Sequence, residues 1–299
     1  MQTPEEFEFV QVVGDGAIGS LVCAGMETLN QPYGRSVRSA PAISSVRTYQ
    51  GRTIALNSDR GKQLNLSQHD LLLLPIKVYQ LESVLEEWAP LLHSHTTIML
   101  LQNGMGGEEC VKARLPHQPL FIASTSHGAY KSTGFVEHTG LGTTKIGSNN
   151  ILRQSWQANA VMELIRSCLG PVVWEENITL ALWVKLAVNA VINPLTALHN
   201  IPNGDLTRLE YQNEIRLICE EISAVMASER IFISARELVE NSLNVAAATA
   251  NNFSSMHQDV KYKRQTEIDS INGFIVMLAK KKGIDVPINT LLLEQIKLL

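Results

Sequence analysis

The 299-residue sequence has little cysteine, and its cysteines stand in no pattern that suggests cross-links or metal binding. The four of them are scattered, without a C-x-x-C pair or metal-ligand spacing: Cys23, Cys110, Cys168 and Cys219. A disulfide framework and a zinc site are therefore not expected, and unpaired thiols fit a reducing compartment. We predict a protein that binds no metal.

The sequence also lacks long runs of one residue class. No apolar run approaches the roughly 18 residues of a membrane-spanning helix, and the formal net charge of −4 comes without a long Lys/Arg run. The first eight residues are acidic and polar, whereas a signal peptide begins with basic residues followed by an apolar core. We therefore expect a cytoplasmic protein without a membrane or nucleic-acid partner.

What the sequence does contain is the composition of an ordinary globular protein, 45% apolar and 18% charged, at a length that suggests two domains. In the first half, brief apolar runs alternate with stretches of helical spacing, which is typical of a parallel sheet covered by helices on both faces. The expected strands are residues 9–13, 71–76, 97–101 and 120–123, and the expected helices are 18–29 and 84–92. A Gly- and Thr-rich segment, 135–147, predicts a hairpin at the end of that sheet.

After Trp174 the apolar residues change to long helical periods. Residues 182–198 form one such stretch, and two others have apolar residues at i, i+3, i+7 and i+10: Ile215, Ile218, Ile222 and Val225, and then Ile268, Ile271, Ile275 and Leu278. The change of period places a domain boundary near residues 175–178. We predict an α/β protein with an N-terminal Rossmann-type doubly wound sheet, residues 1–176, followed by an all-helical C-terminal domain, residues 177–299.

A glycine-rich segment follows the first expected strand and opens the first expected helix: Gly14, Asp15, Gly16, Ala17, Ile18 and Gly19. In a G-x-G-x-x-G turn, the first glycine permits the tight turn, the second lets backbone N–H groups approach a pyrophosphate, and the third lets the helix lie close to the sheet. This setting favours dinucleotide binding over a merely structural glycine turn. Asp15 is unexpected, because a carboxylate beside a bound phosphate would repel it unless the side chain points to solvent.

Three arginines occupy the region that would choose between NAD(H) and NADP(H). An acidic residue about 20 positions after the loop would bind the ribose hydroxyls of NAD, and none lies between residues 30 and 49. The region instead holds Arg35, Arg38 and Arg47, of which Arg38 is best placed, at the end of the second strand, to pair with a 2′-phosphate. The sequence therefore favours NADP(H) as cofactor, with solvated surface arginines as the alternative.

An apolar stretch of the second half carries three polar residues in one stripe. Lys185, Asn189 and Asn193 stand at i, i+4 and i+8, which places them along one side of a helix whose other sides are apolar. Burying them is costly unless something polar binds there, although asparagine can also satisfy buried backbone and lysine can extend to water. A desolvated lysine can protonate and stabilise the alkoxide that forms when hydride adds to a ketone. Lys185 is therefore a candidate proton donor.

A polar segment near the C-terminal end leaves two interpretations open. Ser255 followed by Gln258 matches a capping box, which makes Ser255 a helix N-cap. The same position suits a substrate carboxylate, since a helix N-terminus has unpaired N–H groups and the serine adds a hydroxyl. Glu267, expected on the helix that follows, is by itself an ordinary surface acid.

These segments together resemble the ketopantoate reductase (2-dehydropantoate 2-reductase) family, the NADPH enzymes of pantothenate synthesis. The resemblance covers nearly the whole chain and is carried by residues 14–19, 71–80, 102–106, 185–198, 202–204, 252–259 and 266–273. It implies reduction of a small molecule, ketopantoate, to pantoate. It also implies a Rossmann domain followed by a helical domain.

The resemblance further implies roles for single residues. Lys185 is similar to the family's general acid, and Glu267 to the acid that hydrogen-bonds the substrate and orients this lysine. The implied substrate contacts are Asn189, Asn193, Asn203, Asn252 and Ser255. The implied cofactor contacts are residues 14–19, Arg38 at the 2′-phosphate, Lys77, and Asn103 between cofactor and substrate.

Other interpretations keep part of this picture. The substrate could be another 2-oxoacid, such as a branched-chain or amino-acid-derived one, because the sequence does not reveal the size of the pocket. A catalytically silent NADP(H)-sensing or scaffold module is the alternative from another class, but it leaves the polar stripe at residues 185, 189 and 193 without a purpose. The sequence allows either a monomer or a homodimer.

Overall fold

The computed structural model describes residues 6–37, 42–57 and 64–299 of the chain. The chain divides into two compact units, one made of Met1–Gln102 and Gly107–Ile178 and the other of Asn103–Gly106 and Thr179–Leu299. The sequence pattern does not indicate that residues 103–106 group with the second unit, because four residues are too few to show a period.

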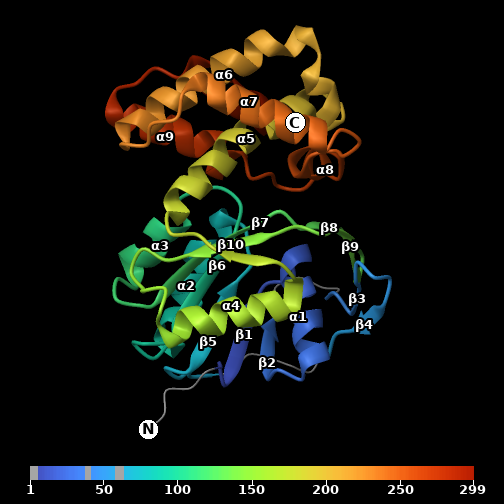
Figure 1. The fold of residues 1–299 in the computed structure, drawn as a ribbon, viewed down its shortest axis with the longest axis vertical. Coiled ribbons are helices and arrows are strands. Elements are labelled where there is room, and N and C mark those ends of the chain that lie inside the picture. The colour runs from blue at the N-terminus through green and yellow to red at the C-terminus, as the bar shows by residue number, and fades with distance from the viewer. Residues whose placement is uncertain (1–5, 38–41, 58–63) are drawn as a thin grey trace. The chain divides into compact units, whose positions relative to one another are not determined.

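The first unit is built around a seven-stranded sheet with the strand order β11-β10-β7-β6-β5-β1-β2 (Figure 1). Its strands are β1 (Phe9–Val13), β2 (Tyr33–Ser36), β5 (Asp70–Leu74), β6 (Thr97–Leu101), β7 (Leu120–Thr125), β10 (Thr144–Gly147) and β11 (Val172–Trp174). Neighbours from β2 to β7 run parallel, β10 is antiparallel to β7, and β11 is parallel to β10. The strand order reverses at β1, so a topological switch point lies at the carboxyl ends of β1 and β5. The predicted doubly wound sheet is confirmed.

Helices cover both faces of this sheet (Figure 1). On one face α1 (Ala17–Leu29) packs against α4 (Trp156–Leu169), and on the other α2 (Leu81–Trp88) packs against α3 (Gly107–Arg114). Two short 3-10 turns flank α2, η1 (Val78–Gln80) and η2 (Ala89–Leu91). The helices stand where the chain must cross over to the next parallel strand, as the alternation of apolar runs and helical periods predicts.

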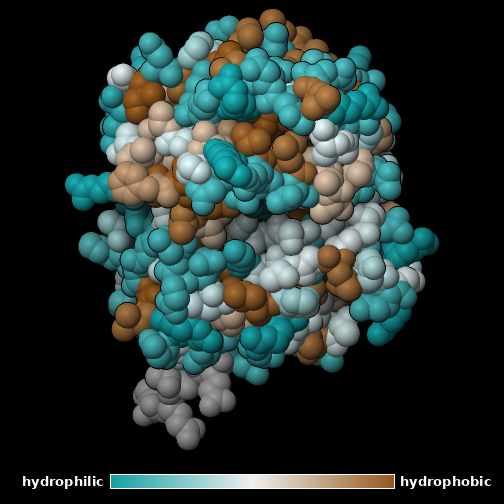
Figure 2. Space-filling view, turned by 45° about the horizontal axis from the view of Figure 1, so that its top comes forward, coloured by the Kyte–Doolittle hydropathy of each residue, from teal (hydrophilic) through white to brown (hydrophobic). Residues whose placement is uncertain are grey.

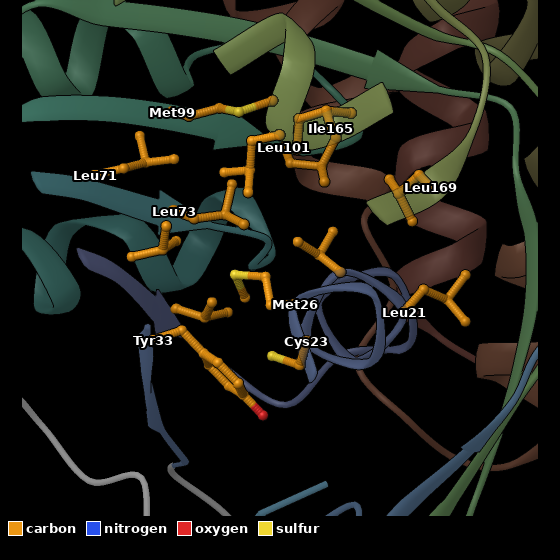
Figure 3. Close-up of a cluster of buried hydrophobic side chains, with 14 of the residues drawn as sticks. Leu21, Cys23, Met26, Tyr33, Leu71, Leu73, Met99, Leu101, Ile165 and Leu169 are labelled. Atoms are coloured by element: carbon orange, nitrogen blue, oxygen red, sulfur yellow. The ribbon is translucent and has the colours of Figure 1, made fainter. Parts of the chain in front are cut away.

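The core on the α1 side explains why these strands are continuous apolar runs. Figure 3 shows Leu71 and Leu73 of β5 in one buried cluster with Cys23 and Met26 of α1. The residue between the two leucines, Leu72, is equally buried, and successive strand residues point to opposite faces. A strand covered on both faces has no position left for a polar side chain.

A second, four-stranded sheet in the same unit corrects one expectation. Its order is β4-β3-β9-β8, from β3 (Ser45–Arg47), β4 (Thr53–Ala55), β8 (Gly128–Ser132) and β9 (Phe135–Gly140). We predicted that residues 135–147 form one hairpin at the end of the large sheet, and this prediction is wrong. β9 pairs with β8 in the small sheet, and β10 pairs with β7 in the large one. Glycine and threonine mark turns, but they do not specify which strands pair across them.

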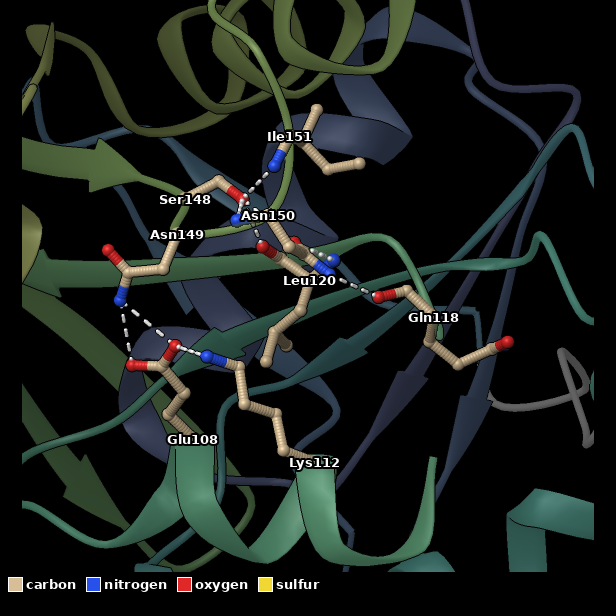
Figure 4. A network of polar contacts seen from close by, with 8 residues as sticks. All are labelled: Glu108, Lys112, Gln118, Leu120, Ser148, Asn149, Asn150 and Ile151. Carbon is tan, nitrogen blue, oxygen red and sulfur yellow. Dashed lines mark hydrogen bonds and ion pairs between the residues drawn. The ribbon is translucent and has the colours of Figure 1, made fainter. Parts of the chain in front are cut away.

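A polar network fixes the loop between β10 and α4 (Figure 4). The Ser148 hydroxyl and the Asn150 amide donate to backbone carbonyls at and just before the start of β7, at 2.7 and 2.8 Å. The Asn149 amide donates to the carboxylate of Glu108 in α3, at 2.9 Å. These bonds satisfy the polar groups of the loop and anchor α3 directly after residues 103–106.

Within the part of the chain that the structure describes, the second unit contains helices joined by loops and no strand, as predicted. They are α5 (Ile178–His199), which starts at the junction of the units, η3 (Asn203–Thr207), α6 (Leu209–Ser228), α7 (Ala235–Ala248), α8 (Ser255–Lys261), η4 (Ile268–Ser270), α9 (Asn272–Lys282) and α10 (Pro287–Lys297). The apolar positions named from the sequence in α6 and α9 are buried in its core. The periodic stretch 268–278 is nevertheless two elements, because Ile271 leaves helical geometry at φ −108° and ψ −93°.

Helix α5 is long and apolar enough to cross a membrane by length and composition alone. More than half of its apolar window, 56%, is buried inside the protein, and its residues Leu186, Val191 and Leu195 belong to the helical core. The core helix of a soluble protein passes the same test of length and composition.

On the face seen in Figure 2, exposed apolar residues are interspersed with hydrophilic ones.

Candidate active site

The glycine loop lies at the switch point of the large sheet. Gly14 has φ +109°, and a Cβ there would stand 2.7 Å from Cγ2 of Ile76. A Cβ at Gly19 would stand 2.6 Å from Cγ of Pro75. Gly14 therefore makes a turn that other residues rarely adopt, and both glycines let the loop and α1 pack against the chain just after β5.

The start of α1 fits a phosphate group. Gly16 is the N-cap of α1 and has no side chain with which to cap the first N–H groups, and the first turn contains no acidic residue. Uncapped N–H groups at the positive end of a helix dipole are an anion site. The residues present therefore fit the pyrophosphate of a dinucleotide.

The side chain of Asp15 does not point to solvent. Its side chain is 2% exposed, and its Oδ1 accepts a hydrogen bond from Nζ of Lys131 at 2.9 Å. Its Oδ2 accepts from the backbone N–H of Ile43 at 3.3 Å. Sequence reasoning missed Lys131, because a partner 116 residues away in a strand of the small sheet leaves no local signal.

Two further cofactor contacts were predicted in the first unit, Lys77 and Arg38. Lys77 follows β5 and caps η1, its backbone N–H donating to Oε1 of Gln80 at 3.1 Å. Because β1 and β5 are parallel neighbours, Lys77 shares the carboxyl edge of the sheet with the glycine loop. Arg38 lies outside the described residues.

Neither of the other two arginines is an unpaired surface residue. Arg35 is buried, and its Nη2 donates to the backbone carbonyl of Ile43 at 2.6 Å. Arg47 is half-exposed and forms an ion pair with Glu137 at 3.5 Å. The alternative of solvated surface arginines is therefore wrong for Arg35, whereas Arg47 is an exposed arginine of the surface, as that alternative expects.

In the second unit, Lys185 stands in a polar cluster inside α5. Its Nζ donates to Oδ1 of Asn103 at 2.9 Å. Burial lowers the pKa of Lys185 from 10.5 to about 8, while the negative charge of Glu267 acts in the opposite direction. The lysine is therefore still mostly protonated at neutral pH, but it is a stronger acid than an ordinary lysine.

The position of Glu267 overturns its reading as a surface acid. The residue is 5% exposed and begins η4, rather than lying on the helix that starts near Ser255. Its charge acts on Lys185, 82 residues earlier in the chain. Periodicity missed this burial, because the helical pattern is interrupted on both sides of the residue.

The substrate residues expected on α5 keep their predicted stripe. Asn193 is buried and Asn189 is half-buried in this helix. The helix continues through Pro194, which has no N–H to donate to the Ala190 carbonyl. The Nδ2 of Asn272 donates to that carbonyl instead, at 3.1 Å. A proline within a predicted helix signals such an unpaired carbonyl, but not the residue that satisfies it.

Asn203 and Asn252 are brought together after α5. The backbone N–H of Asn203 donates to the Asn252 carbonyl at 2.9 Å, and the Asn203 amide donates to Oγ1 of Thr249 at 2.9 Å. Oδ1 of Asn203 is buried without a hydrogen-bond partner among the residues that the structure describes. A buried amide oxygen in this condition suits a ligand donor.

The capping interpretation of Ser255 is wrong by one residue. The N-cap of α8 is Ser254, whose Oγ accepts from the His257 N–H at 3.1 Å and from Oγ1 of Thr196 at 2.8 Å. Ser255 is the first helical residue and is exposed. Because Thr196 belongs to α5, this contact ties the Ser255 segment to the helix that carries Lys185.

Comparisons with known proteins identify the family of the chain. Residues 10–150 match the family model "Ketopantoate reductase PanE/ApbA", and residues 177–299 match "Ketopantoate reductase PanE/ApbA C terminal". The chain is 38% identical over 292 residues to a 2-dehydropantoate 2-reductase of Vibrio cholerae, covering 97% of each chain. It is 40% identical over 232 residues to that of Escherichia coli O157:H7, covering 78% of this chain and 75% of the relative.

Among solved structures, D-mandelate dehydrogenase bound to NADH and anilino(oxo)acetate matches with a TM-score of 0.85 and 22% identity over 97% of each chain. At this identity the match concerns the fold.

Proposed function

Because the chain belongs to the ketopantoate reductase family, we propose that it reduces the C2 carbonyl of ketopantoate to pantoate with NADPH. The reaction supplies pantoate for pantothenate, the precursor of coenzyme A, and we place it in the cytoplasm. The observation that carries the proposal is Lys185, a half-buried lysine with a pKa of about 8 that is hydrogen-bonded to Asn103 and influenced by Glu267.

Residues of the first unit would hold the cofactor. The first N–H groups of α1 and the loop of residues 14–19 would bind the pyrophosphate, with Lys77 at the same edge of the sheet. Arg38 would pair with the 2′-phosphate, and Asn103 would lie against both the nicotinamide and the substrate. Bound NADPH supplies the hydride that attacks C2.

Lys185 supplies the proton. As the carbonyl oxygen gains negative charge, the ammonium stabilises it, and Nζ then transfers a proton to form the hydroxyl. The pKa of about 8 suits this step, because the group is protonated before the reaction and releases its proton more readily than an ordinary lysine. The neutral amine regains a proton from water. Asn103 and Glu267 hold the ammonium in position.

Amides and a hydroxyl of the second unit would bind the rest of the substrate. Asn189 and Asn193 offer amide groups along the same stripe as Lys185, and Ser255 offers a hydroxyl to the carboxylate. The unpartnered Oδ1 of Asn203 would accept from a substrate hydroxyl, next to Asn252. These groups recognise a small polar acid rather than an apolar molecule.

The direct test is the oxidation of NADPH by the purified full-length protein with ketopantoate. We expect turnover with NADPH and a much lower kcat/KM with NADH. Equal rates with the two cofactors would overturn the NADP(H) assignment. Binding of NADPH without turnover of any 2-oxoacid would instead support a sensing or scaffold module.

A second candidate substrate class is another 2-oxoacid. The fold match to a D-mandelate dehydrogenase, whose structure holds anilino(oxo)acetate, is the observation that favours it. A panel of branched-chain, aromatic and unbranched 2-oxoacids, compared by kcat/KM, separates the two candidates. Ketopantoate ranking below any of them would replace the substrate proposed above.

The assembly is either a monomer or a homodimer. A similar fold, with a TM-score of 0.80 and 23% identity, is that of a dimeric ketopantoate reductase from Staphylococcus aureus. Light scattering on the purified protein, with and without NADPH, decides between the two states.

A further inference from the structure

We propose that Lys131 is a cofactor-binding residue and that Asp15 is the positioning residue that holds it at the glycine loop. The inference rests on the proposed function, because it assigns a ligand to the loop. The chemistry recognised is the pyrophosphate of a dinucleotide. Neither residue is needed for the hydride or proton step.

The first observation is how Lys131 meets the loop. Its Nζ donates to the backbone carbonyl of Asp15 at 2.6 Å and to the carboxylate of the same residue at 2.9 Å. An ammonium has three N–H donors, so these two bonds leave one for a ligand. The Lys131 side chain is 37% exposed, whereas that of Asp15 is 2% exposed. The charge that a ligand can reach is therefore that of the lysine.

The second observation is the charge balance around the loop. A lone carboxylate in the loop would repel a pyrophosphate, and a buried carboxylate also needs a partner. Lys131 neutralises Asp15 directly. Arg35, which is 6% exposed, adds a second cation, and both it and Asp15 influence the electrostatics of Cys23 in α1. The carboxylate of Asp15 is thus paired with a cation, so it no longer repels an anion at the start of α1.

The third observation is that one backbone segment joins Asp15 and Arg35. The N–H of Ile43 donates to Asp15, and its carbonyl accepts from Arg35. Nη1 of Arg35 is buried without a hydrogen-bond partner in the described part of the chain. Asp15 thus links the glycine loop to the small sheet through Lys131 and to the strand-β2 region through Ile43. A glycine, serine or asparagine at position 15 could not make this set of charged contacts.

The test is a set of NADPH titrations followed by cofactor fluorescence, on full-length variants. Lys131→Met should raise the Kd for NADPH by about tenfold or more, because it leaves the Asp15 charge uncompensated near the phosphates. Lys131→Arg, which keeps the charge, should bind within about threefold of the original. The matched control is Lys145→Met. Lys145 lies in β10 of the large sheet, its side chain is 51% exposed, and it forms an ion pair with Glu175 at 3.2 Å.

A charge cycle separates this role from a merely structural one. The double variant Asp15→Asn/Lys131→Met should bind NADPH more tightly than Lys131→Met alone, because it removes the unpaired anion as well. A structural latch predicts the opposite order, since the double variant loses more contacts. If Lys131→Met does not fold, the double variant is compared with Asp15→Asn, and loss of the lysine there should still weaken binding by about threefold.

Two further measurements test whether the charge of Lys131 acts on the pyrophosphate. Adenosine 2′-monophosphate lacks the pyrophosphate, so its Kd should be unchanged in Lys131→Met. The kcat at saturating NADPH should also be unchanged, while KM for NADPH rises. An equal loss for both ligands, or a Kd for NADPH within about twofold of the original, overturns the inference. Failure of the original protein to bind NADPH at all overturns the proposed function instead.

Discussion

The glycine loop and the lysine cluster of α5 are both polar sites in apolar surroundings, but they are assembled differently. The loop consists of six consecutive residues whose function lies in the backbone, at the end of one strand and the start of one helix. The lysine cluster brings Lys185 together with Asn103, 82 residues earlier in the chain, and with Glu267, 82 residues later. A backbone site can therefore be recognised from a short motif, whereas a side-chain cluster needs the whole fold.

The two regions should also fail in different ways when they are changed. A substitution at Gly14 or Gly19 acts through sterics and cofactor affinity, because a Cβ has no room at either position. A substitution in the lysine cluster acts through charge and proton transfer, and should leave cofactor affinity largely intact.

The sharpest test of this difference is Lys185→Ala. We expect kcat for ketopantoate reduction to fall by about 10² to 10⁴-fold, the usual contribution of a general acid. The Kd for NADPH should change by less than about twofold, since the loop is untouched. Stopped-flow single-turnover kinetics measures the step itself, with Lys145→Ala as the exposed-lysine control. Near-normal kcat would remove Lys185 from the mechanism.

The reciprocal change is Gly14→Ala. The positive φ of +109° and the 2.7 Å approach to Ile76 both oppose a side chain. We expect the protein to lose about 2–4 kcal/mol of unfolding free energy, and NADPH affinity to fall at least about tenfold. Gly51→Ala is the matched control, because Gly51 has φ +82° but nothing within 4 Å of its Cβ position. Equal losses in urea unfolding for both variants would contradict the steric argument.

The pH dependence tests the lysine cluster without any substitution. Reduction needs the ammonium, so kcat/KM should fall about tenfold per pH unit above pH 8 or so, the pKa of Lys185. The reverse oxidation of pantoate needs the neutral amine and should rise through the same pH range. Folding stability should also rise from about pH 8 toward the ordinary lysine pKa of 10.5, since there the unfolded chain binds the proton that the folded one has released. Parallel pH profiles for the two reaction directions would be inconsistent with this assignment.

The smallest expected effect concerns the support of α5. Asn272→Leu leaves the Ala190 carbonyl without its donor and should cost about 1–3 kcal/mol of unfolding free energy. Pro194→Ala restores an N–H four residues after Ala190, so in that background the cost of Asn272→Leu should shrink by about 1 kcal/mol. Urea denaturation of the four variants measures the cycle. Strictly additive losses would show that the two groups do not share this carbonyl.

The difference between the glycine loop and the lysine cluster also explains how much of the fold and the site could be predicted from the sequence. The bounds of strands β1 and β6 were predicted correctly and those of α1 to within one residue, because burial on both faces and a tight turn depend on consecutive residues. The polar stripe of α5 follows from helical spacing alone.

The errors at the candidate site involve partners far apart in the sequence. Lys131 reaches Asp15 from the small sheet, whose pairing of β3 with β9 joins segments about 90 residues apart. Glu267 is buried, and its charge acts on Lys185, which lies 82 residues earlier in the chain. At α8, two consecutive serines both suit an N-cap, and the contact of Thr196 with Ser254 distinguishes them only in the fold.

Pro194 affects the order in which the chain can complete its hydrogen bonds during synthesis. Ribosomes release the N-terminal end first, and the Ala190 carbonyl has to wait for Asn272, which is synthesised 82 residues later. Until α9 docks, the middle of α5 lacks one hydrogen bond at the turn between Asn189 and Asn193. A chain that stops before Asn272 can form the glycine loop, but it lacks this hydrogen bond in the helix that carries Lys185. The helix with the proposed proton donor thus gains its last support only after most of the chain has been made.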